Sequence, residues 1–265
     1  MTYPAFKKII WSHYKKYRRE MPWREDITPY RIVVSEIMLQ QTQAERVVKK
    51  FNSFIKRFPN FKSLAKASLQ DVLKEWQGLG YNRRGLNLHR LAQTIKGKLP
   101  ETYAELLELP AIGPNTAGSV LAFAYNLPHP FIETNIRTVF IHFFFKNHKG
   151  KVHDKKLMPI ITKTLDTKNP REWYYALMDY GAYLKKAQTN PSRRSKHHIR
   201  QSKFKGSNRE LRANILKILL EKPQSFESIV KHFSEKSVIV IDKNVKDLQK
   251  EGFIVLRKNK YEIKA

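Results

Sequence analysis

The chain has 265 residues, of which 41% are hydrophobic, so it can bury one large core or two modest ones. Its 51 lysines and arginines outnumber 23 acidic residues, and the formal charge of +28 favours a polyanion as partner, although a ribosome-associated or generally basic protein would look similar. The absence of cysteine excludes disulfides and thiolate clusters, and we find neither a signal peptide nor an apolar run of roughly 20 residues, so we expect a soluble, intracellular protein.

Apolar residues recur at helical spacing along most of the first 205 residues. Thr28 followed by Pro29 is typical of a helix start, and Gly78 and Gly80 are typical of a helix end. No convincing strand pattern precedes residue 205, so we expect this part to be all-α. The spacing predicts helices over residues 4–18, 29–43, 47–55, 64–76, 84–98, 101–109, 136–145, 154–165 and 171–185.

The stretch from Leu106 to Val120 predicts a helix end, a tight turn and a new helix. Pro110 ends the first helix, and Pro114 suits the first position of the second. Gly113 between them can adopt a positive φ or let another backbone come close. The unpaired N–H groups of such a helix start suit a phosphate, although an ordinary helix–turn–helix corner explains the spacing equally well.

Residues 206–265 differ in character from the rest of the chain. Two amphipathic helices come first, followed by a β-branched run at 238–241, a helix over 243–251 and two strand-like pieces around Asn259. This order resembles a winged helix, a small α+β domain. Its 13 basic and 8 acidic residues give a charge of only +5, against +23 for residues 1–205. A DNA-reading wing and a protein-docking module therefore both stay open.

Several segments, taken together, resemble helix-hairpin-helix DNA glycosylases, and among these the adenine-DNA glycosylases of the MutY type. They lie in the family's order, cover roughly residues 5–185 and are far more specific in combination than singly. The segments are MPWR (21–24), TPYRIVVSEIMLQQTQ (28–43), EWQGLGYNRRGLNLH (75–89), the hairpin LPAIGPNTAG, FIETNIRTV (131–139) and ALMDYGA (176–182).

The resemblance implies a two-lobed glycosylase core over residues 1–205. Residues 29–129 would form a six-helix lobe, and residues 1–28 with 130–205 a second lobe. Double-stranded DNA with a mispaired or damaged base would lie in the cleft between the lobes. We expect a monomer in the cytoplasm, associated with the nucleoid and not with a membrane.

The basic segment 185–205 carries eight lysines and arginines and no acidic residue. It is either a solvated linker or an arm along the DNA backbone, with Arg193 and Arg194 as DNA contacts. In most members of the resembling family this place carries four cysteines that hold an iron–sulfur cluster. Lys185 stands near the expected first cysteine, so we expect no such cluster, while a monovalent cation at the hairpin backbone stays open.

Two carboxyl groups are the predicted catalytic pair, because purine excision needs an acid for the departing base and an anion beside the sugar cation. Glu36 is the predicted acid, since it shares a helix stripe with Ile32 and Val33, where desolvation favours the protonated form. The resemblance gives the glutamate of SE-x-MLQQT this role. Glu133 is the predicted anion, since it precedes a helix whose positive end stabilises a carboxylate.

Two departures from the family pattern affect this pair. The family has aspartate where Glu133 stands, so a capping role for Glu133 stays open. Asn115 stands where bifunctional relatives such as endonuclease III place a Schiff-base lysine, and an amide nitrogen is not a nucleophilic amine. The resemblance therefore implies a monofunctional enzyme in which Glu36, Glu133 and Asn115 form the catalytic set.

The predicted DNA contacts follow from the resembling segments. Gln41 and Tyr81 would wedge into the duplex, although Tyr81 is equally consistent with plain packing. The arginines would position phosphates rather than specify sequence. The full set is Gln40, Gln41, Thr42, Tyr81, Arg83, Arg84, Ile112, Gly113, Thr116, Arg137, Arg193 and Arg194.

The predicted activity is excision of adenine opposite 8-oxoguanine or guanine in base excision repair. Residues 206–265 are too short for the 8-oxoguanine-recognition domain of full-length family members. A mismatch thymine/uracil glycosylase and a non-catalytic DNA-binding protein therefore stay open as alternatives.

Overall fold

The computed structural model describes residues 1–201 and 203–264, and it is helical apart from one antiparallel two-stranded sheet. The chain packs into two compact units, one made of Met1–Glu36 with Lys98–Arg200 and the other of Ile37–Gly97 with Gln201–Ala265. These units cut across the boundaries expected at residues 29, 129 and 205, and the expected division stays a prediction. Within the described residues, no helix combines the length and hydropathy that a bilayer crossing requires.

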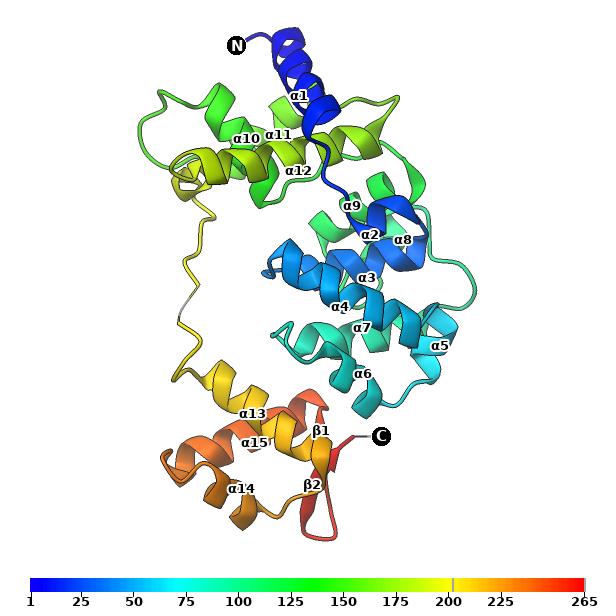
Figure 1. The fold of residues 1–265 in the computed structure, drawn as a ribbon, viewed down its shortest axis with the longest axis vertical. Coiled ribbons are helices and arrows are strands. Elements are labelled where there is room, and N and C mark those ends of the chain that lie inside the picture. Colours follow the sequence, from blue (N-terminus) through cyan, green and yellow to red (C-terminus); the bar gives the residue numbers. More distant parts are fainter. Residues whose placement is uncertain (202, 265) are drawn as a thin grey trace. The chain divides into compact units, whose positions relative to one another are not determined.

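The first unit is built around two helices that pack closely together, α10 and α12, on which α1 packs (Figure 1). Phe6 of α1 lies with its ring centroid 5.2 Å from that of Phe140 in α10 and 5.9 Å from that of Trp173 in α12. All three rings are fully buried, so they form the centre of this core. The helices of the unit are α1 (Tyr3–Tyr17), α2 (Pro22–Glu25), the start of α3 (Pro29–Leu39), α8 (Tyr103–Leu107), α9 (Pro114–Tyr125), α10 (Thr134–Phe144), α11 (Asp154–Thr164), α12 (Pro170–Ala187) and the 3₁₀ turn η1 (Pro191–Arg194).

The second unit combines four helices from the middle of the chain with a C-terminal module, residues 207–264. The module has the predicted order of helices followed by a hairpin. Strands β1 and β2 pair from Ile254↔Ile263 to Arg257↔Lys260, and Lys258 and Asn259 take the positive φ of a tight hairpin turn. The elements are α4 (Ala44–Arg57), α5 (Phe61–Lys66), α6 (Leu69–Trp76), α7 (Arg83–Thr94), α13 (Asn208–Glu221), α14 (Phe226–His232), α15 (Val238–Glu251), β1 (Ile254–Arg257) and β2 (Lys260–Ile263).

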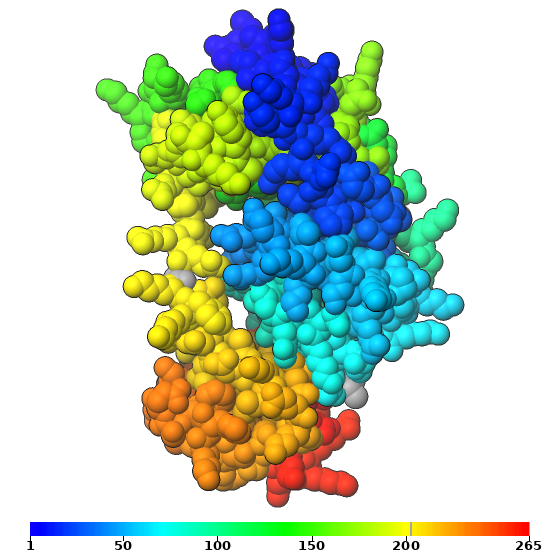
Figure 2. Space-filling view, viewed as in Figure 1, coloured from blue at the N-terminus to red at the C-terminus, as the bar shows by residue number. Residues whose placement is uncertain are grey.

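The C-terminal module shares one hydrophobic core with α6 and α7. Leu69 and Leu73 of α6 and Leu86 of α7 are almost fully buried together with module residues such as Ile215 and Leu248. In Figure 2 the gold residues at the start of the module border the cyan helices. The module is therefore part of the second unit's core rather than an appendage on it.

Two predicted elements differ from the structure because serine side chains cap helices. The helix expected over 64–76 is two helices, since Ser68 accepts a hydrogen bond from the Asp71 N–H and starts α6 anew. The β-branched run 238–241 is the first turn of α15, since Ser237 accepts one from the Val240 N–H. Local capping outweighs the weak strand preference of valine and isoleucine here.

Candidate active site

The hairpin joins α8 to α9 and carries its positive φ at an unexpected residue. Gly113 is the N-cap of α9 at φ −94°, and the positive φ belongs to Ala111 at 68°. Ile112 is buried and anchors the turn, whereas Thr116 in the first turn of α9 is partly exposed. A Cβ added to the exposed Gly113 would meet nothing within 4 Å among the described residues. The backbone at the start of α9 is therefore accessible to a ligand.

Replacing Ala111 by glycine is expected to stabilise the protein by about 1 kcal/mol, because a left-handed φ is strained in a residue that has a Cβ. Thermal unfolding measures the effect as a higher Tm. Ala117→Gly is the control, since Ala117 lies buried inside α9 and glycine there should lower stability by about 1 kcal/mol or more. A lower Tm for Ala111→Gly would contradict the strained geometry.

Glu36 lies on α3 with its carboxyl group desolvated, although the residue keeps some exposed surface. Its neighbours Val33 and Ile37 are fully buried. The pKa of Glu36 is raised to about 7, mainly by burial: the Ser119 hydroxyl and Arg24 lower it, and the nearby negative charge of Glu133 raises it. The pair predicted from sequence is thus electrostatically coupled, and Glu36 is partly protonated near neutral pH.

Ser119 connects Glu36 to the hairpin helix α9. Its side chain is 2% exposed, hydrogen-bonds the Glu36 carboxyl group and donates from Oγ to the Thr116 carbonyl oxygen at 3.0 Å. The hydrogen bond from Ser119 lowers the pKa of Glu36 and so partly offsets the effect of burial. Sequence analysis did not single out Ser119, because nothing in the local sequence shows that a serine inside this helix contacts Glu36.

Glu133 is the N-cap of α10. One carboxylate oxygen accepts from the Asn135 and Ile136 N–H groups at 2.8 and 3.0 Å, and the other accepts from Asn135 Nδ2 at 3.2 Å. The helix start and these three donors suit a negative charge. Asn115 lies near by, since its Oδ1 accepts a 3.4 Å hydrogen bond from the Ile132 N–H. The capping geometry therefore also fixes Glu133 in place.

Arg24, whose charge acts on Glu36, belongs to a buried ion pair that sequence analysis missed. Arg24 donates to both carboxylate oxygens of Asp179 at 2.9 Å, and Arg19 adds Nε at 2.6 Å and its backbone N–H at 3.0 Å. Burial would raise the pKa of Asp179, but the bonds and charge of Arg24, followed by those of Arg19, lower it below its usual value. The guanidinium of Arg24 also stacks 4.2 Å from the Tyr175 ring centroid. Because 155 residues separate the partners, no local pattern could pair them.

Arg84 of α7 holds two loops of the second unit together. Burial lowers the pKa of Arg84 to about 10. The phosphate contact expected from sequence would require several of the hydrogen bonds that its guanidinium makes to the protein to break. Arg84 fixes the end of α3 at Leu39, where Gln41 turns to φ 56° and is exposed. Its guanidinium donates to the carbonyl oxygens of Ile37, Met38, Gln40, Leu79 and Gly80 and to the Thr42 hydroxyl.

Tyr81 lies at the turn before α7 with φ 49°. Its hydroxyl accepts a 2.6 Å bond from Arg209 and another from the Gln201 side chain. The guanidinium groups of Arg84 and Arg209 lie 5.6 and 5.1 Å from its ring centroid. The ring is thus held by the C-terminal module, and its predicted role as a wedge stays a prediction.

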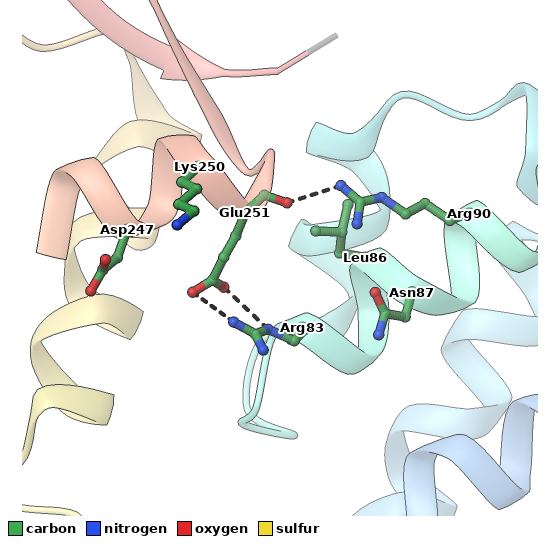
Figure 3. Close-up of a pocket in the computed structure, with 7 residues that line it drawn as sticks. All are labelled: Arg83, Leu86, Asn87, Arg90, Asp247, Lys250 and Glu251. Atoms are coloured by element: carbon green, nitrogen blue, oxygen red, sulfur yellow. Dashed lines mark hydrogen bonds and ion pairs between the residues drawn. The ribbon is translucent and has the colours of Figure 1, made fainter. Parts of the chain in front are cut away.

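Arg83 is paired with the end of α15 (Figure 3). It makes a 2.7 Å ion pair with Glu251, which also binds Arg212 at 2.8 Å. Arg90 donates to the Glu251 carbonyl oxygen at 2.9 Å. These bonds clamp the module to α7, and a pocket lies beside them whose lining includes neither Glu36 nor Glu133. Its lining residues are Arg83, Leu86, Asn87, Arg90, Asp247, Lys250 and Glu251.

The remaining predicted arginines lie in the first unit. Arg137 makes a bidentate pair with Asp154 at 2.8 and 2.7 Å, Arg194 donates to the Lys146 carbonyl at 3.1 Å, and Arg193 is exposed. The chain around η1 is packed rather than extended, since Ser192 and Ser195 are 2% exposed. Among the described residues, no group of three or more metal-binding side chains is found, and the chain supplies no cysteine for an iron–sulfur cluster.

Known proteins resemble this chain in sequence and in fold. Residues 34–165 match the family model of the HhH-GPD superfamily base excision DNA repair proteins. An adenine DNA glycosylase of Buchnera aphidicola subsp. Baizongia pistaciae is 36% identical over 189 residues, which are 69% of this chain and 54% of that protein. An adenine DNA glycosylase of Mycobacterium tuberculosis is 40% identical over 131 residues, 48% of this chain and 43% of that protein. The chain spans about half the length of these curated relatives.

The structure resembles a solved thermostable thymine-DNA glycosylase with a TM-score of 0.62 and 23% identity, over 71% of this chain and 90% of that one. This likeness concerns the fold: a helix-hairpin-helix glycosylase core. Residues 34–165 of this chain form a domain of the HhH-GPD superfamily. Its curated relatives are adenine DNA glycosylases.

Proposed function

We propose that this protein is a monofunctional DNA glycosylase of base excision repair that hydrolyses the N-glycosidic bond of adenine mispaired with 8-oxoguanine or guanine. The observation that carries the proposal is the coupled pair of Glu36, whose pKa burial raises to about 7, and Glu133 at the start of α10. The relatives named adenine DNA glycosylase and the charge of +28 support the same assignment.

The chemistry follows from the two carboxyl groups. Glu36 gives its proton to the extruded adenine, and the bond between the sugar and the base breaks with its electron pair leaving on the base. The carboxylate of Glu133 stabilises the cation that forms on the sugar. Water then adds to the sugar carbon that carried the base, and its released proton returns to Glu36. The product is an abasic site.

The hairpin and the exposed turn after α3 bind the DNA in this proposal. The open backbone at Gly113, beside Ile112 and Thr116, receives a phosphate, with or without a bound monovalent cation. Gln41 at the exposed turn after α3 contacts the partner base. Because the chain has no cysteine, the proposed enzyme works without an iron–sulfur cluster.

A panel of duplexes tests the proposal directly. Duplexes containing A:8-oxoG, A:G, T:G, U:G or hypoxanthine:T are incubated with the full chain and scored for alkali-labile abasic sites. We expect strand breaks after alkali at adenine only. Cleavage at T:G or U:G would instead identify a thymine/uracil glycosylase, and binding without any excision a non-catalytic DNA-binding protein. Borohydride should trap no covalent adduct, and a trapped adduct would contradict the monofunctional assignment.

The excision rate should depend on pH through Glu36. The acid acts while protonated, so the single-turnover rate is expected to be steady below pH 7 and to fall about tenfold per pH unit above it. DNA binding, measured at the same pH values, separates this loss from weaker association. A rate that rises between pH 7 and 9 would rule out Glu36 as the proton donor.

A further inference from the structure

Helix α12 approaches the start of α10 unusually closely at Gly181. A Cβ at this position would lie 2.5 Å from the Asn135 carbonyl oxygen and 2.7 Å from the Asn135 Cβ, so a side chain of any size would force the helices apart. Lys185 follows four residues later and therefore lies on the same face of α12. The close approach brings the lysine to the residue that contacts Glu133.

Three groups form a chain of hydrogen bonds at this crossing. Lys185 Nζ donates to Asn135 Oδ1 at 2.7 Å, and Asn135 Nδ2 donates to Glu133 at 3.2 Å. An amide can face either way, but an ammonium group accepts no hydrogen bond, so it must face the amide oxygen. Lys185 thereby fixes the amide with its N–H₂ group toward the carboxylate of Glu133.

Charges of both signs act on the ammonium group of Lys185. Burial lowers the pKa of Lys185, Glu133 raises it and Arg19 lowers it. The amine therefore supplies a positive charge close to Glu133 without bonding to it directly. Two departures from the family pattern meet here, since Lys185 stands near the expected first cysteine and Glu133 replaces an aspartate.

We propose that Lys185 is a positioning residue for the catalytic anion, because it orients Asn135, which in turn holds the longer side chain of Glu133 in its reactive place. The inference rests on the proposed function of Glu133. Lys185 itself does not touch the substrate. Its loss should therefore slow the chemical step more than it weakens DNA binding.

The test compares Lys185→Met with Lys163→Met, another last-turn lysine, which is exposed on α11. Single-turnover excision at saturating enzyme is measured on the duplex that the full chain cleaves best, and DNA affinity on the same duplex. We expect the rate of Lys185→Met to fall about tenfold or more with DNA affinity changed less than threefold, and Lys163→Met to match the unaltered chain. Lys185→Arg should restore most of the rate, since it keeps the charge and the donor.

A double-mutant cycle with Asn135→Ala distinguishes positioning from general damage. If Lys185 acts through Asn135, adding Lys185→Met to Asn135→Ala should cause no further loss of rate. Should Lys185→Met fold poorly by thermal unfolding, Lys185→Gln replaces it in the cycle. Normal excision by the lysine variant, or losses that simply multiply, would overturn this inference alone. Absence of excision by the unaltered chain would overturn the proposed function and the inference with it.

Discussion

Replacing Glu36 by glutamine is expected to reduce base excision by roughly 10²–10⁴-fold while duplex DNA is still bound, because glutamine keeps the shape but has no acidic proton to transfer. Single-turnover excision and DNA affinity of the variant measure the two effects. A variant that still excises the base at more than a tenth of the normal rate would show that another group is the acid.

The same substitution should stabilise the fold, which excludes misfolding as the cause of lost activity. Burial raises the pKa of Glu36 from 4.5 to about 7, so ionising the group opposes folding increasingly between these pH values and fully above them. Glu36→Gln removes that penalty. Its Tm should therefore exceed that of the unaltered chain at pH 8, and the difference should shrink toward pH 4.5.

Asp179→Ala is expected to destabilise the protein by about 3–5 kcal/mol, because it leaves Arg24 buried without its counter-charge. Denaturant unfolding at pH 7 measures this loss. The control is Glu25→Ala, which removes the exposed pair between Arg18 and Glu25 and should change stability by about 1 kcal/mol or less. Equal effects of the two variants would contradict the importance assigned to the buried pair.

The stability that the Asp179–Arg24 pair contributes depends on pH with the opposite sign from the stability effect of Glu36. The pKa of Asp179 is lowered in the folded protein, so the pair stabilises the fold above the ordinary value of 3.8 and the effect is lost as pH falls through the lowered value. The difference in stability between the unaltered chain and Asp179→Ala should therefore narrow in acid.

Sequence reasoning reached the features that depend on neighbouring residues. Pro29 and Pro114 start helices as expected, and the place of Glu133 before a helix follows from the chain around it. The helical class, the C-terminal hairpin and the family are confirmed by the fold and the comparisons. Glu36 could be selected because a carboxyl group in an apolar stripe is unusual.

The features that sequence reasoning missed depend on tertiary contacts. Arg84 and Arg83 stay predicted DNA contacts, but sequence reasoning could not find their present partners, the backbone carbonyl of Met38 and the carboxylate of Glu251, because both lie far along the chain. The positive φ fell on Ala111, where residue type gives no hint. Lys185 could be noted only as a substituted cysteine position, since its contact with Asn135 requires two helices to meet at Gly181.

The leucine-lined contact between α6, α7 and the C-terminal module restricts how the chain can be shortened. An expression fragment that stops near residue 205 would uncover Leu69, Leu73 and Leu86 and lose the Arg83–Glu251 clamp. Such a fragment would expose an apolar surface patch and tend to aggregate. Low activity of a shortened protein would then reflect its aggregation and not the loss of a catalytic group.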